Sequence, residues 1–124
     1  MLDPRRVPAV SATEAHRRLD GAVAPDAPIL VDVREPHEFA KVRAEGAALL
    51  PLSTFLLRHT ELPQDRAILM ICNSGARSAQ TTAFLLANGW TDVSNVAGGT
   101  IAWLQAGLPS RQGTLEAGEG DLTR

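Results

Sequence analysis

The chain contains a single cysteine, Cys72, in a position typical of a reactive thiol. It directly follows the apolar run at residues 67–71, which predicts a buried strand, and it precedes small residues that lead into a predicted helix. Unpaired N–H groups at the start of a helix stabilise a thiolate and lower its pKa, and Arg77 adds a permanent positive charge. The sequence therefore predicts a nucleophilic Cys72 in an anion-binding loop, whose other members are Asn73, Ser74, Gly75, Ala76, Arg77 and Ser78.

A structural thiol is the alternative interpretation of Cys72. Free cysteine is among the most buried residue types and usually behaves as a small hydrophobic side chain. The neighbouring residues favour the functional interpretation, because Gly75 permits backbone conformations that are closed to other residues and nothing in 73–78 is bulky enough to shield the sulfur.

Composition excludes several functional classes. The chain has 124 residues, 44% of them hydrophobic and 21% charged, which suits one globular domain. A net charge of −2, with scattered Lys and Arg, argues against nucleic-acid binding. One cysteine cannot form an intramolecular disulfide, and His16, His37 and His59 lack metal-ligand spacing, so we expect no metal and no cofactor. No segment approaches membrane-spanning length or resembles a signal peptide, and we expect a soluble cytoplasmic protein without a membrane partner.

Apolar runs and helix signals alternate along the chain. Strands are predicted at 29–33, 67–71 and 93–96. Helices are predicted from a capping box at Ser11 to about Gly21, and at 36–42, 53–60, 77–88 and 100–106. This alternation predicts an α/β fold with a small, mostly parallel sheet and helices on both faces. Functional sites in such folds lie at the carboxyl ends of the strands, where Cys72 is placed.

The predicted domain covers residues 1–109. Residues 110–124 contain three glycines and few apolar side chains, and we expect this C-terminal segment to be disordered.

Three sequence blocks in residues 7–109 resemble the single-domain rhodaneses, which belong to the rhodanese-like sulfurtransferase family. The blocks are VDVREPHEF at 31–39, CNSGARS at 72–78, and VAGGTIAW at 96–103 followed by AGLP at 106–109. They are similar to the family patterns D-x-R-x-x-x-E-[FY], C-x-x-G-x-R-S and G-G-x-x-x-W…G-[LY]-P. The family commonly has G-H-I-x-G-A where this chain has VRAEGA at 42–47. We expect that departure, which places Arg43 at the histidine position, to affect partner or substrate preference rather than the fold.

The resemblance implies a sulfurtransferase reaction. Cys72 would attack the sulfane sulfur of thiosulfate or of a persulfide donor, become a persulfide, and pass the sulfur to cyanide or a thiol. The loop amides and Arg77 would hold the small anionic donor. A sulfur-accepting protein is a further candidate partner.

Other residues have structural interpretations. At the end of a buried strand, Asp32 and Arg34 are expected to satisfy each other and neighbouring loop amides. Trp103 is expected to pack under the active-site loop, Trp90 to lie in the core or to form a partly buried cap, and His37 to lie on the surface. Ser78 could hydrogen-bond the sulfur or cap its helix.

Two other functions remain as alternatives. Cysteine phosphatases and arsenate reductases use a C-x5-R loop, whereas four residues separate Cys72 from Arg77, and no Asp follows closely as a general acid. A persulfide carrier or interaction module with little small-molecule turnover would need the same residues as the enzyme, so the sequence does not separate these two.

Overall fold

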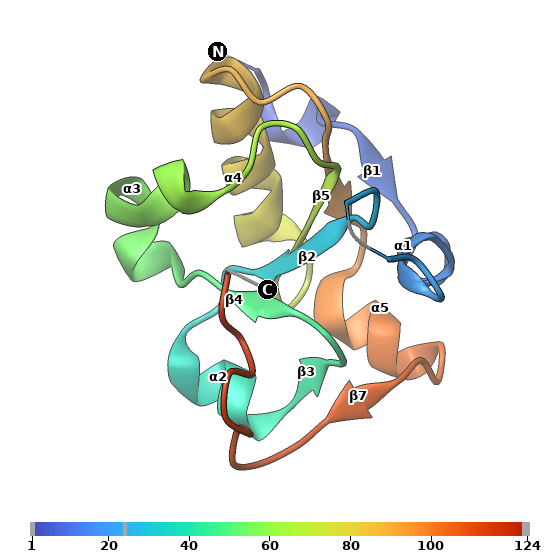
Figure 1. The fold of residues 1–124 in the computed structure, drawn as a ribbon. Helices are drawn as coiled ribbons and strands as arrows, with labels where there is room; N and C mark the ends of the chain where they lie inside the picture. Colours follow the sequence, from blue (N-terminus) through green and yellow to red (C-terminus); the bar gives the residue numbers. More distant parts are fainter. Residues whose placement is uncertain (1, 24, 123–124) are drawn as a thin grey trace.

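The computed structural model describes residues 2–23 and 25–122, which form a parallel sheet surrounded by helices (Figure 1). The sheet has five strands in the order β1-β6-β5-β2-β4, and every neighbouring pair is parallel. The strands are β1 (Ala9–Val10), β2 (Ile29–Asp32), β4 (Ala48–Leu49), β5 (Ile68–Ile71) and β6 (Val93–Val96). The predicted α/β class with a mostly parallel sheet is therefore confirmed.

Helices cover both faces of the sheet, also as predicted. Alternate residues of a strand point to opposite faces. On one face, Val31 and Met70 pack in a cluster with Phe55 of α3 (Phe55–Arg58) and Leu85 of α4 (Ala76–Ala87). On the other face, Leu30, Leu69 and Ile71 pack with side chains from α1 (Ala12–Leu19), α2 (Pro36–Lys41) and α5 (Gly99–Gln105). Figure 1 shows α3 and α4 on the opposite side of the sheet from α1 and α5.

The strand register brings the ends of β2 and β5 together. Asp32 is paired with Ile71, so Cys72 and the residues that follow β2 emerge at the same edge of the sheet. This is the carboxyl edge, the expected place for a site.

Local sequence signals located most helices correctly. Ser11 accepts a hydrogen bond from the Glu14 amide at 3.0 Å, which is the predicted capping contact at the start of α1. The helix predicted at 53–60 is instead divided into η2 (Leu52–Thr54), α3 and η3 (His59–Glu61). The sequence did not predict the two-residue strands β1 and β4 or the short helix η1 (Pro4–Arg6). Elements of two or three residues are too short to show a periodic pattern. No helix in the described part of the chain is long and apolar enough to cross a membrane.

The C-terminal segment is folded as far as residue 122, contrary to the predicted disorder. β7 (Ser110–Arg111) pairs antiparallel with β3 (Arg43–Ala44), and the Leu49 amide donates to the Gly120 carbonyl at 2.7 Å. Leu122 is 9% exposed and belongs to the core. In Figure 1 the segment, in red, runs beside α2 and β4. Residues 123 and 124, which the prediction of disorder also covered, lie outside the described residues.

Arg43 anchors this segment. Its side chain is 2% exposed and forms a two-point ion pair with Glu119, with Nη2 and Oε1 2.9 Å apart, and Nη1 donates to the Gly113 carbonyl at 2.9 Å. The departure from the family pattern at Arg43 was expected to affect substrate or partner preference and not the fold. Its contacts in this structure are structural, and composition alone missed them because an ion pair and backbone bonds, together with a few apolar side chains such as Leu122, hold the segment.

Replacing Glu119 with Gln should lower the free energy of unfolding by about 1.5–3 kcal/mol at pH 7, because Arg43 is left as a buried charge without its partner. Arg43 lowers the pKa of Glu119 from 4.5 to about 2, so the pair's contribution is complete above pH 4.5 and is lost as pH falls toward 2. Urea unfolding of both proteins should therefore show their difference shrinking over that range. The control is Glu116→Gln, since Glu116 has a 74% exposed side chain paired with Arg111, and its loss should cost less than about 0.5 kcal/mol. Equal effects of the two variants would contradict the anchoring role.

Candidate active site

Cys72 follows β5 at the carboxyl edge of the sheet and is 1% exposed. The chain then turns through residues 73–75 and enters α4, whose N-cap is Gly75 in the left-handed region at φ +104°. A residue with a Cβ rarely adopts that conformation, which explains glycine at this position. The seven residues 72–78, which we call the Cys72 loop, contain every residue that the sequence predicted for the site.

Hydrogen-bond donors surround the sulfur. The Gly75 amide donates to Sγ at 3.1 Å, and the Ser78 hydroxyl oxygen lies 3.3 Å from Sγ. Burial of the thiol raises its pKa, but bonds from the Ser78 hydroxyl and from the amides of Ser78, Gly75 and Ser74 outweigh that effect. The pKa of Cys72 therefore lies below its ordinary value of 9.0. Asn73, Ser74 and Ala76 are exposed on the outside of the loop.

Arg77 is paired with a carboxylate from another element. Its two terminal nitrogens donate to Glu38 of α2 at 2.8 and 2.9 Å. This pairing is the main reason that the pKa of Arg77 is raised, and the charge of Cys72 is a smaller contribution. Arg77 in turn lowers the pKa of Glu38 to about 2. The predicted positive charge acts on Cys72, but Glu38 shares it, and the groups that donate to the sulfur are amides and a hydroxyl.

The start of α5 holds the carbonyl side of the Cys72 loop. The Thr100 amide and hydroxyl donate to the Cys72 carbonyl at 2.8 and 3.0 Å, and the Ile101 amide donates to the Asn73 carbonyl at 3.1 Å. Gly99 permits this approach, because a Cβ there would lie 2.5 Å from the Cys72 carbonyl oxygen. A Cβ at Gly98 would lie 2.6 Å from the Ala102 Cβ, so steric contacts explain both glycines.

Asp32 and Arg34 form a buried ion pair beside the loop, as the sequence predicted. Arg34 Nη2 lies 2.8 Å from Asp32 Oδ2. The two carboxylate oxygens of Asp32 and the Val42 carbonyl accept hydrogen bonds from most of the N–H groups of the Arg34 side chain. The Arg34 amide also donates to Asp32 at 2.9 Å. Both side chains are engaged with each other, which is consistent with a structural role.

Asn95 of β6 contacts the Cys72 loop but was not predicted. Its Oδ1 lies 2.6 Å from the Ser78 hydroxyl, and its Nδ2 donates to the Gly75 carbonyl at 3.1 Å. The only sequence signal was a polar residue next to Val96 in the strand predicted at 93–96.

The remaining singled-out residues lie where they were expected. Trp103 is 1% exposed, donates to the Pro109 carbonyl at 2.7 Å, and packs edge-on against His16. Trp90 is buried in the core and His37 is exposed.

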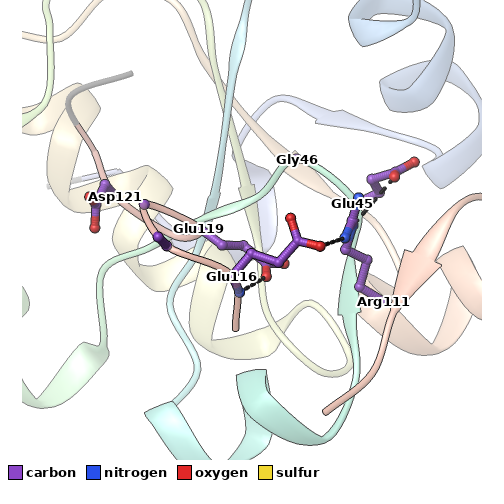
Figure 2. Close-up of a pocket in the computed structure, with 8 residues that line it drawn as sticks. Glu45, Gly46, Arg111, Glu116, Glu119 and Asp121 are labelled. Carbon is purple, nitrogen blue, oxygen red and sulfur yellow. Dashed lines mark hydrogen bonds and ion pairs between the residues drawn. The ribbon is translucent and has the colours of Figure 1, made fainter. Parts of the chain in front are cut away.

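A separate hollow of about 480 Å³ lies beside the C-terminal segment and not at Cys72. Figure 2 shows Arg111 between Glu45 and Glu116, whose carboxylates lie 3.4 and 3.1 Å from it. Glu119 and Asp121 also line the hollow, with Asp121 at the opposite end of the view. Among the residues that the structure describes, no group of three or more His, Cys, Asp or Glu side chains is arranged to hold a metal ion.

Comparison with known proteins identifies the family. Residues 11–106 match the model of the rhodanese-like domain. The chain is 43% identical over 81 residues to a sulfurtransferase from Allochromatium vinosum, covering 65% of this chain and 76% of that protein. It is 34% identical to thiosulfate sulfurtransferase 16, chloroplastic, from Arabidopsis thaliana, covering 90% of this chain and 99% of that protein. A crystal structure of a rhodanese-related protein from Thermoplasma volcanium superposes with a TM-score of 0.75 at 26% identity, covering 84% of this chain and 97% of the other.

The family model covers most of the chain, and the fold, the Cys72 loop and the sulfurtransferase names of its relatives agree with it. The chain belongs to the rhodanese-like family.

Proposed function

We propose that this protein is a sulfurtransferase in which Cys72 carries the transferred sulfur as a persulfide. The observation that carries the proposal is the ring of donors around a single buried thiol, made by the amides of Ser74, Gly75 and Ser78 and the Ser78 hydroxyl. Such a ring stabilises negative charge on sulfur without a general base. Arg77 and the loop amides are the proposed binding groups for an anionic donor.

The proposed reaction has two balanced steps. The Cys72 thiolate attacks the outer sulfur of thiosulfate, an S–S bond forms to Cys72, and the S–S bond of the donor breaks with its electron pair leaving on sulfite. Cyanide or a thiolate then attacks the terminal sulfur of the persulfide and the Cys72 thiolate is restored. No external oxidant or reductant is required.

The phosphatase or arsenate reductase alternative has less support. Phosphate-ester cleavage requires a general acid at the leaving group. The carboxylates beside the loop are both engaged, Glu38 by Arg77 and Asp32 by Arg34. The four-residue spacing between Cys72 and Arg77 also leaves a smaller loop than C-x5-R.

Thiosulfate is the proposed donor because a relative that covers nearly the whole chain is named a thiosulfate sulfurtransferase. A protein persulfide as donor and a protein thiol as acceptor would use the same Cys72 chemistry. The relative rates with the two kinds of donor distinguish an enzyme for small molecules from a persulfide carrier.

Mixing the protein with thiosulfate should add one sulfur atom to its intact mass, because Cys72 is the only thiol, and cyanide should then remove that sulfur and release thiocyanate. Mass spectrometry and a thiocyanate assay follow the two steps, with an iodoacetamide-blocked sample as the control. Loading from a cysteine-derived persulfide donor but not from thiosulfate would identify a carrier. Hydrolysis of aryl phosphates without any added sulfur would overturn the proposal.

A further inference from the structure

Two hydrogen bonds join Asn95 to the Cys72 loop, and its side-chain amide donates in one and accepts in the other. The Gly75 carbonyl can only accept, so the Asn95 amide nitrogen must face it, at 3.1 Å. The Asn95 amide oxygen is thereby turned toward the Ser78 hydroxyl, 2.6 Å away. Asn95 is 7% exposed, and reversing the amide would place two buried oxygen atoms together. The orientation of Asn95 is therefore determined by Gly75.

The Ser78 hydroxyl has one proton and two neighbouring acceptors. The Asn95 oxygen lies 2.6 Å away, whereas Sγ of Cys72 lies 3.3 Å away. The amide oxygen cannot donate, so the contact with Asn95 exists as a hydrogen bond only when Ser78 gives it the proton. The two acceptors therefore compete for one proton, and whenever Ser78 donates it to Asn95 the bond from Ser78 to the sulfur is weakened.

We infer that Asn95 is a positioning residue that competes with the Cys72 sulfur for the Ser78 proton and so weakens the bond from Ser78 to the thiolate. The inference rests on the proposed function and deepens it. In the persulfide the charge lies on the terminal sulfur, so Sγ loses little when Ser78 donates to Asn95. In the thiolate the same competition weakens one of the donors to the sulfur. A thiolate with weaker stabilisation is a stronger nucleophile toward sulfur, so Asn95 favours attack on the donor and the loaded state.

The charged groups around Cys72 are the same whether or not Asn95 is present. Arg77 of α4 interacts electrostatically with Cys72 and is paired with Glu38 of α2, and Asp32 at the end of β2 is paired with Arg34. The elements β6 and α5 contribute the uncharged Asn95 and Thr100. A change in the ionisation of Cys72 after substitution of Asn95 therefore reports on hydrogen bonding.

The test is the pH profile of iodoacetamide alkylation of Cys72 in the Asn95→Leu variant, which keeps a similar shape without polar atoms. Without a competing acceptor the Ser78 hydroxyl should bond the thiolate more strongly, so the profile should move to lower pH and alkylation on its acid side should rise roughly tenfold. If Asn95 only supported the loop through Gly75, its loss would disturb the amides around the sulfur and move the profile to higher pH. A shift to higher pH, or no shift, overturns the inference. Asn95→Ala decides the sign if the leucine variant does not fold.

A double variant tests the route of the effect. Adding Asn95→Leu to Ser78→Ala should leave the alkylation profile of Ser78→Ala unchanged, because Asn95 acts through the Ser78 hydroxyl. A further shift in the double variant would overturn that route. Thr82→Val is the matched control, since it removes a buried hydroxyl that bonds the Ser78 carbonyl and not the sulfur, and its profile should match the wild type.

Alkylation requires no sulfur donor, so this test is separate from that of the proposed function. An acid shift in Asn95→Leu, in a protein that never takes sulfur from any donor, would reject sulfur transfer and leave the role of Asn95 in ionisation standing. Normal sulfur loading with no shift in the Asn95→Leu profile would reject the inference alone.

Discussion

Replacing Cys72 with serine is expected to reduce sulfur transfer to background, a loss of about a thousandfold or more. Serine has nearly the same shape, but its hydroxyl does not ionise near neutral pH and cannot form a persulfide. The donors around the site would remain, since the Gly75 and Ser78 groups are positioned by α4 and not by the sulfur. Thiocyanate release and intact mass after thiosulfate treatment measure the loss.

Two controls separate lost chemistry from lost structure. Circular dichroism and the thermal midpoint of the serine variant should match the wild type, because the buried volume hardly changes. Wild-type protein blocked with iodoacetamide should be equally inactive, since Cys72 is the only site for alkylation at sulfur besides methionine thioethers, which react far more slowly. Sulfur loading by the folded serine variant would remove Cys72 from the reaction.

Replacing Gly99 with alanine should have the second large effect. A Cβ at Gly99 would lie 2.5 Å from the Cys72 carbonyl oxygen and 2.6 Å from that of Asn73, and the residue has φ +58°. Backbone must move, and the bonds from Thr100 and Ile101 to those carbonyls are weakened. We expect a loss of about 2–4 kcal/mol in the free energy of unfolding and a fall in transfer rate on the order of 100-fold, because the loop donors move relative to the sulfur.

Gly107→Ala is the matched control for Gly99→Ala. Gly107 follows the same helix and has φ +70°, but a Cβ there would meet nothing within 4 Å. In this variant only the cost of placing a residue with a Cβ at positive φ applies, so its free energy of unfolding should fall by about 1 kcal/mol and its transfer rate should be unchanged. Urea unfolding and sulfur transfer are measured for both. Similar transfer rates in the two variants would show that the contact of Gly99 with the loop has no part in holding it.

The immediate surroundings of Cys72 could be predicted because they depend on neighbours in sequence. An apolar run ending at Ile71 specifies a buried strand, Gly75 permits the left-handed turn, and the small residues after it begin a helix whose amides face the sulfur. The ion pair of Asp32 with Arg34 was predicted for the same reason, since the two residues are close in the chain.

The C-terminal segment shows where composition was insufficient. Its low apolar content predicted disorder, yet Arg43 and Glu119 pair across the fold and Leu122 enters the core. A single buried ion pair with backbone bonds leaves no periodic signal in the sequence.

The tertiary structure alone decided which distant residues control the Cys72 loop. Glu38 reaches Arg77 across 39 residues, Asn95 reaches Ser78 across 17, and Thr100 reaches the Cys72 carbonyl across 28. The sequence by itself determined the thiol, its turn and the helix behind it, because each depends on local backbone conformation and hydrophobic patterning. Strand order and register bring the carboxyl edges of β2, β5 and β6 together, and that long-range pairing determines which side chains share the charge and the proton beside the sulfur.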